Sequence, residues 1–520
     1  MEFNGLLTAT VFLPLAGAIV IAALLRSGGK VHLFATLVLL ADLVLSGLVL
    51  SLYDRGGAER FQIIDRFNWF GEGAIIGSAS FTASYHLAVD GLSAPLVLLT
   101  GLLGLAAVLA SWSIQTRVKE YFVWLLVLQT AVMGVFAAQD FLLFFLFWEL
   151  ELVPMYMLIS IWGTGRKEYS AMKFLVFTIL GGAFMLVGII AVALTSNLAT
   201  FDMTQLSLMG ISSSSVVPVG LIFWFFVAAF AIKLPVWPVH TWLPDAHTDA
   251  PTAVSIMLAG VLLKMGGYGL IRVCVGMFPE LEHAQTYAWV LAVLAVVGVL
   301  YGAIVTLRQT DLKRLIAYSS VSHMGLVLLG VAVGVGGGTL FGSDSENVAG
   351  LALAGASMQM FTHGTITGLL FLLVGLVYEK AHTRYIPDLG GLAGRMPLIA
   401  CGFLIAGLAS LGLPGLSGFV AEVMVFLGSF KAFAWPTALA AFGIVIAAGY
   451  ILWMLERVLF GPRKERFDLI TDASILEAAP AVMLTASIVV IGVYPSLLTD
   501  YFGAGIAHLS QVSDLVSAGK

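Results

Sequence analysis

Long apolar runs separated by short polar loops recur along the whole chain of 520 residues. A run of about 20 residues, folded as a helix, is long enough to cross a hydrocarbon core about 30 Å thick. The pattern predicts an all-α integral membrane protein with about 14 transmembrane helices. The predicted spans cover residues 5–25, 31–53, 87–112, 121–138, 140–162, 169–195, 215–241, 252–278, 285–307, 312–336, 347–379, 396–430, 432–459 and 474–500.

Lysine and arginine are unevenly divided between the loops of the two membrane faces. Loops after odd-numbered spans carry most of them, including Arg26, Lys30, Arg117, Lys119, Arg166, Lys167, Arg308, Lys313, Arg314 and Arg457. Loops after even-numbered spans carry few, mainly Arg55, Arg60, Arg66 and Lys431. Because positively charged loops stay on the cytoplasmic side, we expect both termini on the outer face, as an even number of spans also requires.

The composition agrees with a membrane protein, since 60% of the residues are hydrophobic and only 11% are charged. The first apolar run follows no basic segment, so we interpret it as a retained helix and not a signal peptide. The two cysteines, Cys274 and Cys401, are too few for an iron–sulfur cluster. Segment 54–86 is predicted to form a short strand or hairpin on the outer face, and the glycine-rich stretch 334–338 a flexible outer loop.

Two spans are predicted to be broken. The seventh contains Pro235 and Pro238, and the twelfth contains Gly412, Pro414 and Gly415. Backbone groups freed by such breaks are tolerated at membrane depth only inside protein or beside a wet cavity. Paired breaks indicate two repeats, helices 4–8 and 9–13, and five helices per repeat makes the repeats inverted. The alternative is that both breaks are ordinary kinks.

The repeats divide the chain into four predicted parts. These are residues 1–118, with helices 1–3 and the outer loop 54–86; 119–280, the first repeat; 281–460, the second inverted repeat; and 461–520, helix 14 and a tail.

Ionisable residues inside the predicted spans are the candidate functional groups. Each costs about 3 kcal/mol near the middle of a bilayer, so the presence of Glu149, Lys233, Lys264 and Glu422 favours the movement of an ion. Glu149 and Glu151, two positions apart on a helix, cannot share a face. One is expected to face the proton path and the other a partner helix or a neighbouring subunit. The alternative is a static Glu–Lys pair that only fixes helix packing.

Two histidines in neighbouring spans, His323 and His363, are flanked by hydroxyl side chains. Histidine titrates near neutral pH and can relay a proton through either ring nitrogen, although a buried histidine can also be purely structural. The predicted proton relay is therefore Glu149, Lys233, Lys264, His323, His363 and Glu422. The loop 240–249 contains two histidines and two aspartates, but their spacing fits no usual zinc pattern. We expect proton entry or a subunit contact there, and no metal or cofactor site in this chain.

Six sequence strings carry a resemblance to a known family. They are WELELVPMY at 148–156, KLPVWP at 233–238, HTWLPDAH at 240–247, LAGVLLKMGGYGLIR at 258–272, AYSSVSHMG at 317–325 and LPGLSGFVAE at 413–422. These strings resemble the antiporter-like membrane subunits of proton-pumping NADH:quinone oxidoreductase, respiratory complex I. Glu422 favours the M type of subunit, also called subunit 4. A lysine at this position would look more like the related L or N types.

The resemblance implies a fourteen-helix subunit with broken helices 7 and 12, and it matches the six relay residues named above to the family's relay. It implies no redox cofactor in this chain, with NADH, FMN, iron–sulfur clusters and quinone in partner subunits. The expected partners are the L, N, K, J, A and H types of membrane subunit and the hydrophilic redox arm. The expected location is the bacterial plasma membrane or a thylakoid membrane. No role is transferred to Glu151.

Four other functions remain open from the sequence. A subunit of a multi-subunit cation/proton antiporter would have similar helices without a redox partner. The membrane subunit of an energy-converting hydrogenase is a second alternative. A scaffold would use the buried charges only to hold neighbouring subunits, and a stand-alone carrier would need a roomy polar substrate site near the breaks.

Overall fold

The computed structural model describes residues 2–76, 79–195, 200–209, 217–278, 281–341 and 345–518. Its first part combines helices with a small antiparallel sheet of strand order β1-β2-β3. The elements are β1 (Glu2–Phe3), α1 (Leu6–Leu24), α2 (Gly28–Leu52), β2 (Gln62–Ile76), β3 (Ala79–Val89) and α3 (Ser93–Leu109). The predicted hairpin within segment 54–86 is thus confirmed, with Phe67 paired to Tyr85 in register.

The first predicted repeat begins at α4 and contains the first broken helix. Its elements are α4 (Val118–Ala137), α5 (Phe141–Leu150), α6 (Leu152–Trp162), α7 (Lys167–Thr195), α8 (Met203–Met209), α9 (Val219–Lys233), α10 (Trp242–Asp249), α11 (Thr252–Met257), η1 (Leu258–Leu262), α12 (Leu263–Gly269) and η2 (Leu270–Val275). The last four form one continuous span, in which η1 and η2 are π-helical. Helix α9 ends where the sequence predicts the break.

The second predicted repeat follows the same plan and leads into the C-terminal helices. Its elements are α13 (Ala284–Thr306), α14 (Leu312–Phe341), α15 (Ser345–Ala381), η4 (Ile386–Asp388), η5 (Leu392–Gly394), α16 (Pro397–Ser410), α17 (Ser417–Phe430), α18 (Ala434–Leu455) and η6 (Glu456–Phe460). After it come η7 (Glu465–Phe467), α19 (Ile475–Val493) and α20 (Ser496–Ala518). The break between α16 and α17 confirms the prediction for the twelfth span.

The helices supply fourteen membrane passages, as predicted. Eleven of the described helices are long and apolar enough to cross a membrane, with α5–α6 and α11–η2 each counted as one. The shorter apolar helices α3 and α9, and the broken pair α16–α17, add three more. Passages four to eight and nine to thirteen are two units of five, so the second unit enters the membrane from the opposite side to the first.

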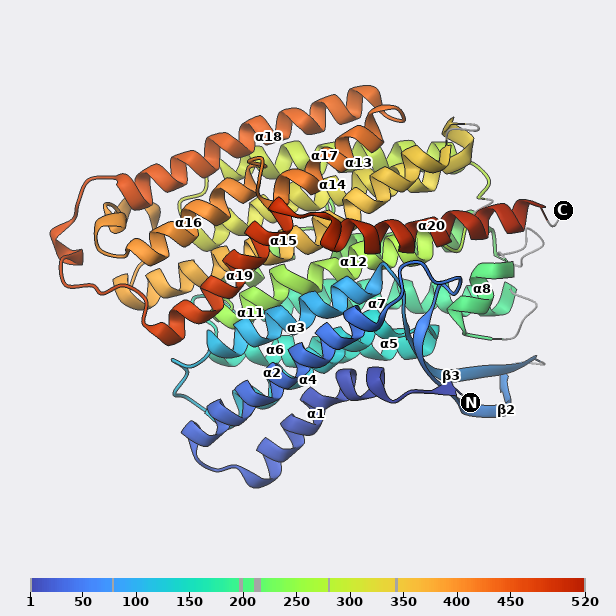
Figure 1. The fold of residues 1–520 in the computed structure, drawn as a ribbon, viewed down its shortest axis with the longest axis horizontal. Helices are drawn as coiled ribbons and strands as arrows, with labels where there is room; N and C mark the ends of the chain where they lie inside the picture. The colour runs from blue at the N-terminus through green and yellow to red at the C-terminus, as the bar shows by residue number, and fades with distance from the viewer. Residues whose placement is uncertain are drawn as a thin grey trace.

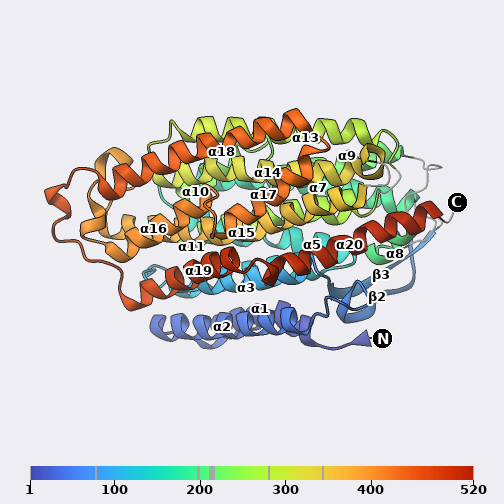
Figure 2. The ribbon, with the colours of Figure 1, turned by 45° about the horizontal axis from the view of Figure 1, so that its top comes forward.

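The passages lie side by side in one elongated bundle (Figures 1 and 2). The β-sheet, α8 and both ends of the chain lie at the same end of this bundle (Figure 1). The most apolar 18-residue stretches of the span 252–275 and of α15 are completely buried in the chain, whereas less than half of the corresponding stretches of α1 and α2 is buried. The centre of the molecule is therefore the place where α12 meets α15.

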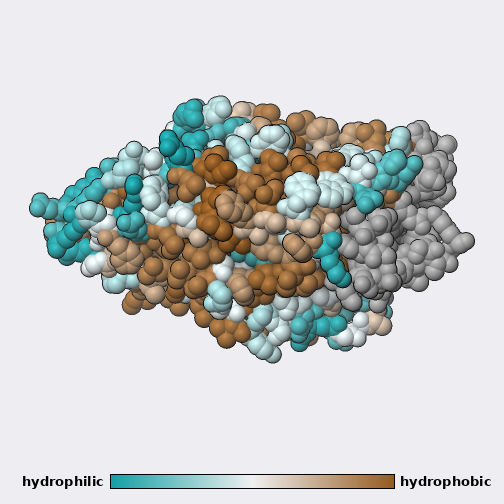
Figure 3. Space-filling model, turned by 90° about the horizontal axis from the view of Figure 1, so that it is seen from above, coloured by the Kyte–Doolittle hydropathy of each residue, from teal (hydrophilic) through white to brown (hydrophobic). Residues whose placement is uncertain are grey.

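The surface follows the expected membrane pattern. Figure 3 shows a broad apolar belt over the middle of the molecule and a hydrophilic cap at its left end. Large apolar side chains such as Val176, Leu427 and Val445 are exposed on helices of the bundle. A belt of this kind is stable against lipid or against other membrane subunits.

One local prediction was wrong. The glycine-rich stretch 334–338 is not a loop, because α14 continues to Phe341. Within this stretch Gly334 packs against Leu353 of α15, and such contacts between long helices outweigh the low helix propensity of glycine. The tail predicted after residue 500 continues as part of helix α20.

Candidate proton-transfer site

The first predicted relay group, Lys233, is the last residue of α9. The helix stops there because Pro235 and Pro238 cannot donate backbone hydrogen bonds, and the indole of Trp242 caps the break by donating to the carbonyl of Ile232 at 2.9 Å. Lys233 is buried, and its amino group lies over the rings of Trp148 and Phe174, 5.4 Å and 5.6 Å from their centroids. The amino group therefore sits in an aromatic pocket at the break.

The carboxylate that holds Lys233 is Glu151 and not Glu149. Glu151 stands at the junction of α5 and α6, is fully buried, and accepts a hydrogen bond from the Lys233 amino group. Its other oxygen, Oε2, has no hydrogen-bond partner among the described residues. The family resemblance transfers no role to Glu151, whereas the structure makes it the direct partner of the first lysine.

Glu149 lies on the other side of α5, as the helical spacing predicts. It is partly exposed, and its carboxyl group rests against Gly182 of α7, where any Cβ would collide with Oε1. That oxygen is buried and unpaired within the described part of the chain. Glu151 therefore faces the interior, and Glu149 faces the outer helix α7.

Lys264, at the centre of the bundle, is fully buried between the π-helical turns η1 and η2. Its amino group donates to the carbonyl of Ala259, an i−5 contact within the same span, and lies 2.8 Å from Nδ1 of His363 on α15. π-Helical turns are rare and are frequently found at functional sites. The contact joins the last helix of the first repeat to the third helix of the second.

The two histidines continue from Lys264 towards the second break. The ring centroids of His323 and His363 are 5.6 Å apart. His323 Nε2 lies 3.2 Å from the hydroxyl of Ser410, the last residue of α16, and its Nδ1 lies 3.6 Å from Oε1 of Glu422. The structure therefore brings Lys264, His363, His323 and Glu422 together in this order.

Glu422 is placed by the break between α16 and α17. It is buried on α17, and its Oε2 lies against Gly412, which has a φ of 74°. Glycine is required here twice, because the positive φ disfavours other residues and a Cβ would occupy the position of the carboxyl oxygen. The break thus makes room for the carboxyl group beside the helix end.

His247 is a buried ionisable residue that the relay prediction left out. It lies on α10, its ring stacks on Phe371 with centroids 4.4 Å apart, and neither ring nitrogen has a partner among the described residues. Phe371 lies on α15, about two helical turns from His363. The sequence signal was present, since His247 belongs to the loop singled out for its histidines, but its burial was not predictable.

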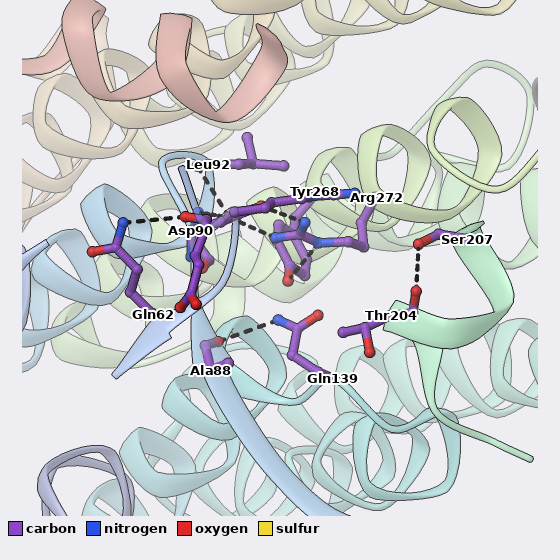
Figure 4. Close-up of polar contacts among 12 residues, drawn as sticks. Gln62, Ala88, Asp90, Leu92, Gln139, Thr204, Ser207, Tyr268 and Arg272 are labelled. Atoms are coloured by element: carbon purple, nitrogen blue, oxygen red, sulfur yellow. Dashed lines mark hydrogen bonds and ion pairs between the residues drawn. The ribbon is translucent and has the colours of Figure 1, made fainter. Parts of the chain in front are cut away.

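A second polar cluster lies towards the end of the bundle that carries the sheet. Arg272 binds Asp90 through two hydrogen bonds of 2.5 Å and 2.7 Å and also donates to Tyr268 at 3.1 Å. Figure 4 shows these three side chains pointing toward one another, beside Gln139, which donates to the carbonyl of Ala88 at 3.2 Å. The cluster ties the last turn of the central span to the loop between β3 and α3.

No group of three or more His, Cys, Asp or Glu side chains is placed to hold a metal ion in the described ranges. Cys274 and Cys401 are both free thiols. What the site offers chemically is a series of buried amino, imidazole and carboxyl groups, which are side chains able to give and take protons.

The sequence and fold of this chain are similar to those of known proteins. The family model "NADH:quinone oxidoreductase/Mrp antiporter, TM" matches residues 138–447. Subunit M of the NADH-quinone oxidoreductase of Rhodobacter capsulatus is 40% identical to this chain, over 98% of the chain and 97% of the relative. The chain belongs to the NADH:quinone oxidoreductase/Mrp antiporter family.

Further relatives of this family member cover similar lengths. Chain 4 1 of the NAD(P)H-quinone oxidoreductase of Synechococcus elongatus is 42% identical over 95% of this chain and 90% of its own. A chain of respiratory complex I from Thermus thermophilus superposes with a TM-score of 0.82 and 27% identity, over 98% of this chain and 99% of that one. A chain of the Mrp complex from Dietzia shares the fold, with a TM-score of 0.82 and 20% identity, over 98% and 99%.

The region matched by the NADH:quinone oxidoreductase/Mrp antiporter model contains all six predicted relay residues, as well as Glu151 and His247. Asp90 and the hairpin lie outside it. The predicted relay residues therefore belong to the part of the chain that the family model matches.

Proposed function

We propose that this chain is a proton-translocating membrane subunit, of the M or chain 4 type, in a multi-subunit NADH:quinone oxidoreductase. The observation that carries the proposal is the buried row Lys264–His363–His323–Glu422, which crosses from the first repeat to the second break. The relatives of nearly full length named as subunit M and chain 4 support the redox-driven form of this function.

The row can pass protons because each neighbour can both give and take one. A Lys264 amino group that donates to Nδ1 of His363 leaves Nε2 of that ring able to carry a hydrogen. His323 is then the group between His363 and the carboxyl of Glu422. Contacts longer than a hydrogen bond would be bridged by water, which is stable where buried polar atoms surround it.

The proton would enter from the cytoplasmic side, pass Glu149, Lys233, Lys264 and the histidines, and leave from Glu422 towards the outer face. We place the chain in a bacterial plasma membrane or a thylakoid membrane, with both termini and the β-sheet on the outer side. NADH, FMN, iron–sulfur clusters and quinone belong to partner subunits in this proposal. The partners are the L, N, K, J, A and H types of membrane subunit and the hydrophilic redox arm.

Two experiments test the proposal. A tagged chain extracted in mild detergent should bring down flavin and iron–sulfur subunits in stoichiometric amounts. In the assembled complex, Glu149→Gln should lower both proton pumping and coupled quinone reduction, whereas Glu168→Gln, an exposed carboxylate at the start of α7, should change neither. Normal pumping by an assembled Glu149→Gln complex would remove Glu149 from the path.

A cation/proton antiporter subunit is the second candidate, because the family model covers Mrp antiporters as well. Co-purification of membrane subunits alone, together with sodium-dependent proton exchange without NADH, would favour it. The same buried lysines would then form an exchange site.

A further inference from the structure

We propose that Glu151 is a second carboxylate of the proton path, which alternates with Glu149 as the partner of Lys233. The inference rests on the proposed function and extends it to Glu151, which the predicted relay does not contain. Glu151 holds the Lys233 amino group, and Glu149 is not among the ion-pair partners of Lys233 in the described chain.

The two carboxylates are placed on opposite sides of one helix junction. Glu151 is both the C-cap residue of α5 and the N-cap residue of α6. Glu149 lies two residues earlier and contacts α7. Lys233 is the last residue of α9, so no further helical turn follows it on the C-terminal side. Its four-carbon side chain is flexible. In this proposal the Lys233 side chain moves and the two carboxyl groups stay in place.

Both carboxylates have a vacant acceptor that the amino group can fill. Oε1 of Glu149 and Oε2 of Glu151 are buried, and each lacks a hydrogen-bond partner among the described residues. An unpaired buried carboxylate oxygen costs free energy that a donor would recover. When the Lys233 amino group moves from one carboxyl group to the other, it donates to an oxygen that had no partner and leaves an oxygen of the first carboxyl group without one.

The charges of the three groups fix where the proton resides. Two carboxylates and one ammonium would leave a net negative charge on groups that lie within membrane-spanning helices, two of them fully buried and Glu149 partly exposed, which is costly. With Lys233 on Glu151, Glu149 therefore carries a proton. When Lys233 moves to Glu149, that proton passes to Glu151, so the group keeps one proton beyond the ion pair and no charge accumulates. The exchange carries one proton from the side of α7 to the interior side of α5.

The variant Glu151→Gln separates this role from a structural one. It removes the partner that Lys233 holds in the structure, so Lys233 should pair permanently with Glu149. The complex should assemble, its electron transfer to an artificial acceptor on the redox arm should be unchanged, and its proton pumping should be lost. Glu151→Asp, which keeps the charge, should restore part of the pumping, and the exposed control Glu168→Gln should behave as the wild type.

Infrared difference spectra of the assembled complex provide a readout that packing alone would not move. The carbonyl band contributed by the protonated carboxyl group of the Glu149–Glu151 pair should be present in the wild type and absent in Glu149→Gln. It should also be absent in Glu151→Gln, because Glu149 is then ionised beside Lys233. An unchanged band and normal pumping in Glu151→Gln would overturn the proposal, and so would failure of that variant to assemble, since Glu149 must be able to accept the lysine.

The outcomes distinguish this inference from the proposed function. Loss of pumping in Glu149→Gln with normal pumping in Glu151→Gln would leave the function intact and remove Glu151 from the path. Normal pumping in both variants would contradict the proposed proton path itself. The double variant Glu149→Gln/Glu151→Gln leaves Lys233 without a carboxylate and should assemble less well than either single variant.

Discussion

The amino group of Lys264 lies 2.8 Å from Nδ1 of His363 and joins the two repeats at the buried centre of the bundle. The two residues are 99 positions apart in the sequence, and both are fully enclosed by the chain. Because an amino group and an imidazole ring can each give and take a proton, this contact is the point where a proton would pass from the first repeat to the second under the proposed function.

Replacing Lys264 by arginine should stop proton transfer while keeping a positive charge at the centre. A guanidinium group stays protonated at every physiological pH and cannot release its proton to His363. We expect Lys264→Arg to slow the proton-transfer step by about 10²-fold or more, measured as NADH-driven acidification in membrane vesicles. Lys30→Arg, at an exposed position, is the matched control. Wild-type pumping by an assembled Lys264→Arg complex would contradict a proton-carrying Lys264.

Gly412 and Gly415 allow the effect of backbone strain to be separated from the displacement of Glu422. Both have positive φ angles, 74° and 90°, but only at Gly412 would a Cβ collide with the Glu422 carboxyl group, since nothing lies within 4 Å of a Cβ at Gly415. Either alanine substitution should destabilise the break by about 1–2 kcal/mol. We expect only Gly412→Ala to lower pumping. Equal pumping in the two variants would show that the position of Glu422 is not important for transfer.

The Asp90–Arg272 pair should contribute to stability far more than an exposed ion pair of the same type. Asp90 is fully buried beside two guanidinium groups, those of Arg272 and Arg60, so Asp90→Asn would leave buried positive charge without a partner. The expected loss is about 3–5 kcal/mol, seen as a lower thermal midpoint of the purified complex. Asp500→Asn breaks an exposed pair with Arg55 and should cost under about 1 kcal/mol.

The contribution of Asp202 to the stability of the folded protein should depend on pH. Burial alone would raise the pKa of Asp202, but hydrogen bonds from His86 and Thr204 and the charge of Arg66 lower it below its usual value. A lowered folded pKa stabilises the protein above the unfolded value of about 3.9, and this stabilisation is lost as the pH falls through the folded pKa. The thermal midpoints of wild type and Asp202→Asn should therefore differ most near neutral pH, begin to converge as the pH falls towards about 4, and coincide only below the folded pKa. A constant difference down to pH 3 would contradict this assignment.

The sequence alone determined the membrane architecture of this protein. The length of the apolar runs fixes the fourteen passages, and prolines or glycines at 235–238 and 412–415 fix the two breaks, because both signals act within a single helix. The ionisable residues of the relay were visible for the same reason, since a charged side chain inside an apolar run stands out without any knowledge of its neighbours.

Only the tertiary structure decided which of these groups meet. Lys233 and Glu151 are 82 residues apart, so their pairing in preference to Glu149 depends on how α5, α6 and α9 pack. The seat of Glu149 on Gly182, the burial of His247 beside Phe371 and the helical course of the glycine-rich stretch 334–338 depend equally on neighbours distant in the chain. A local pattern specifies what a segment can form, but the partner of a buried charge is chosen by the long-range packing that removes it from water.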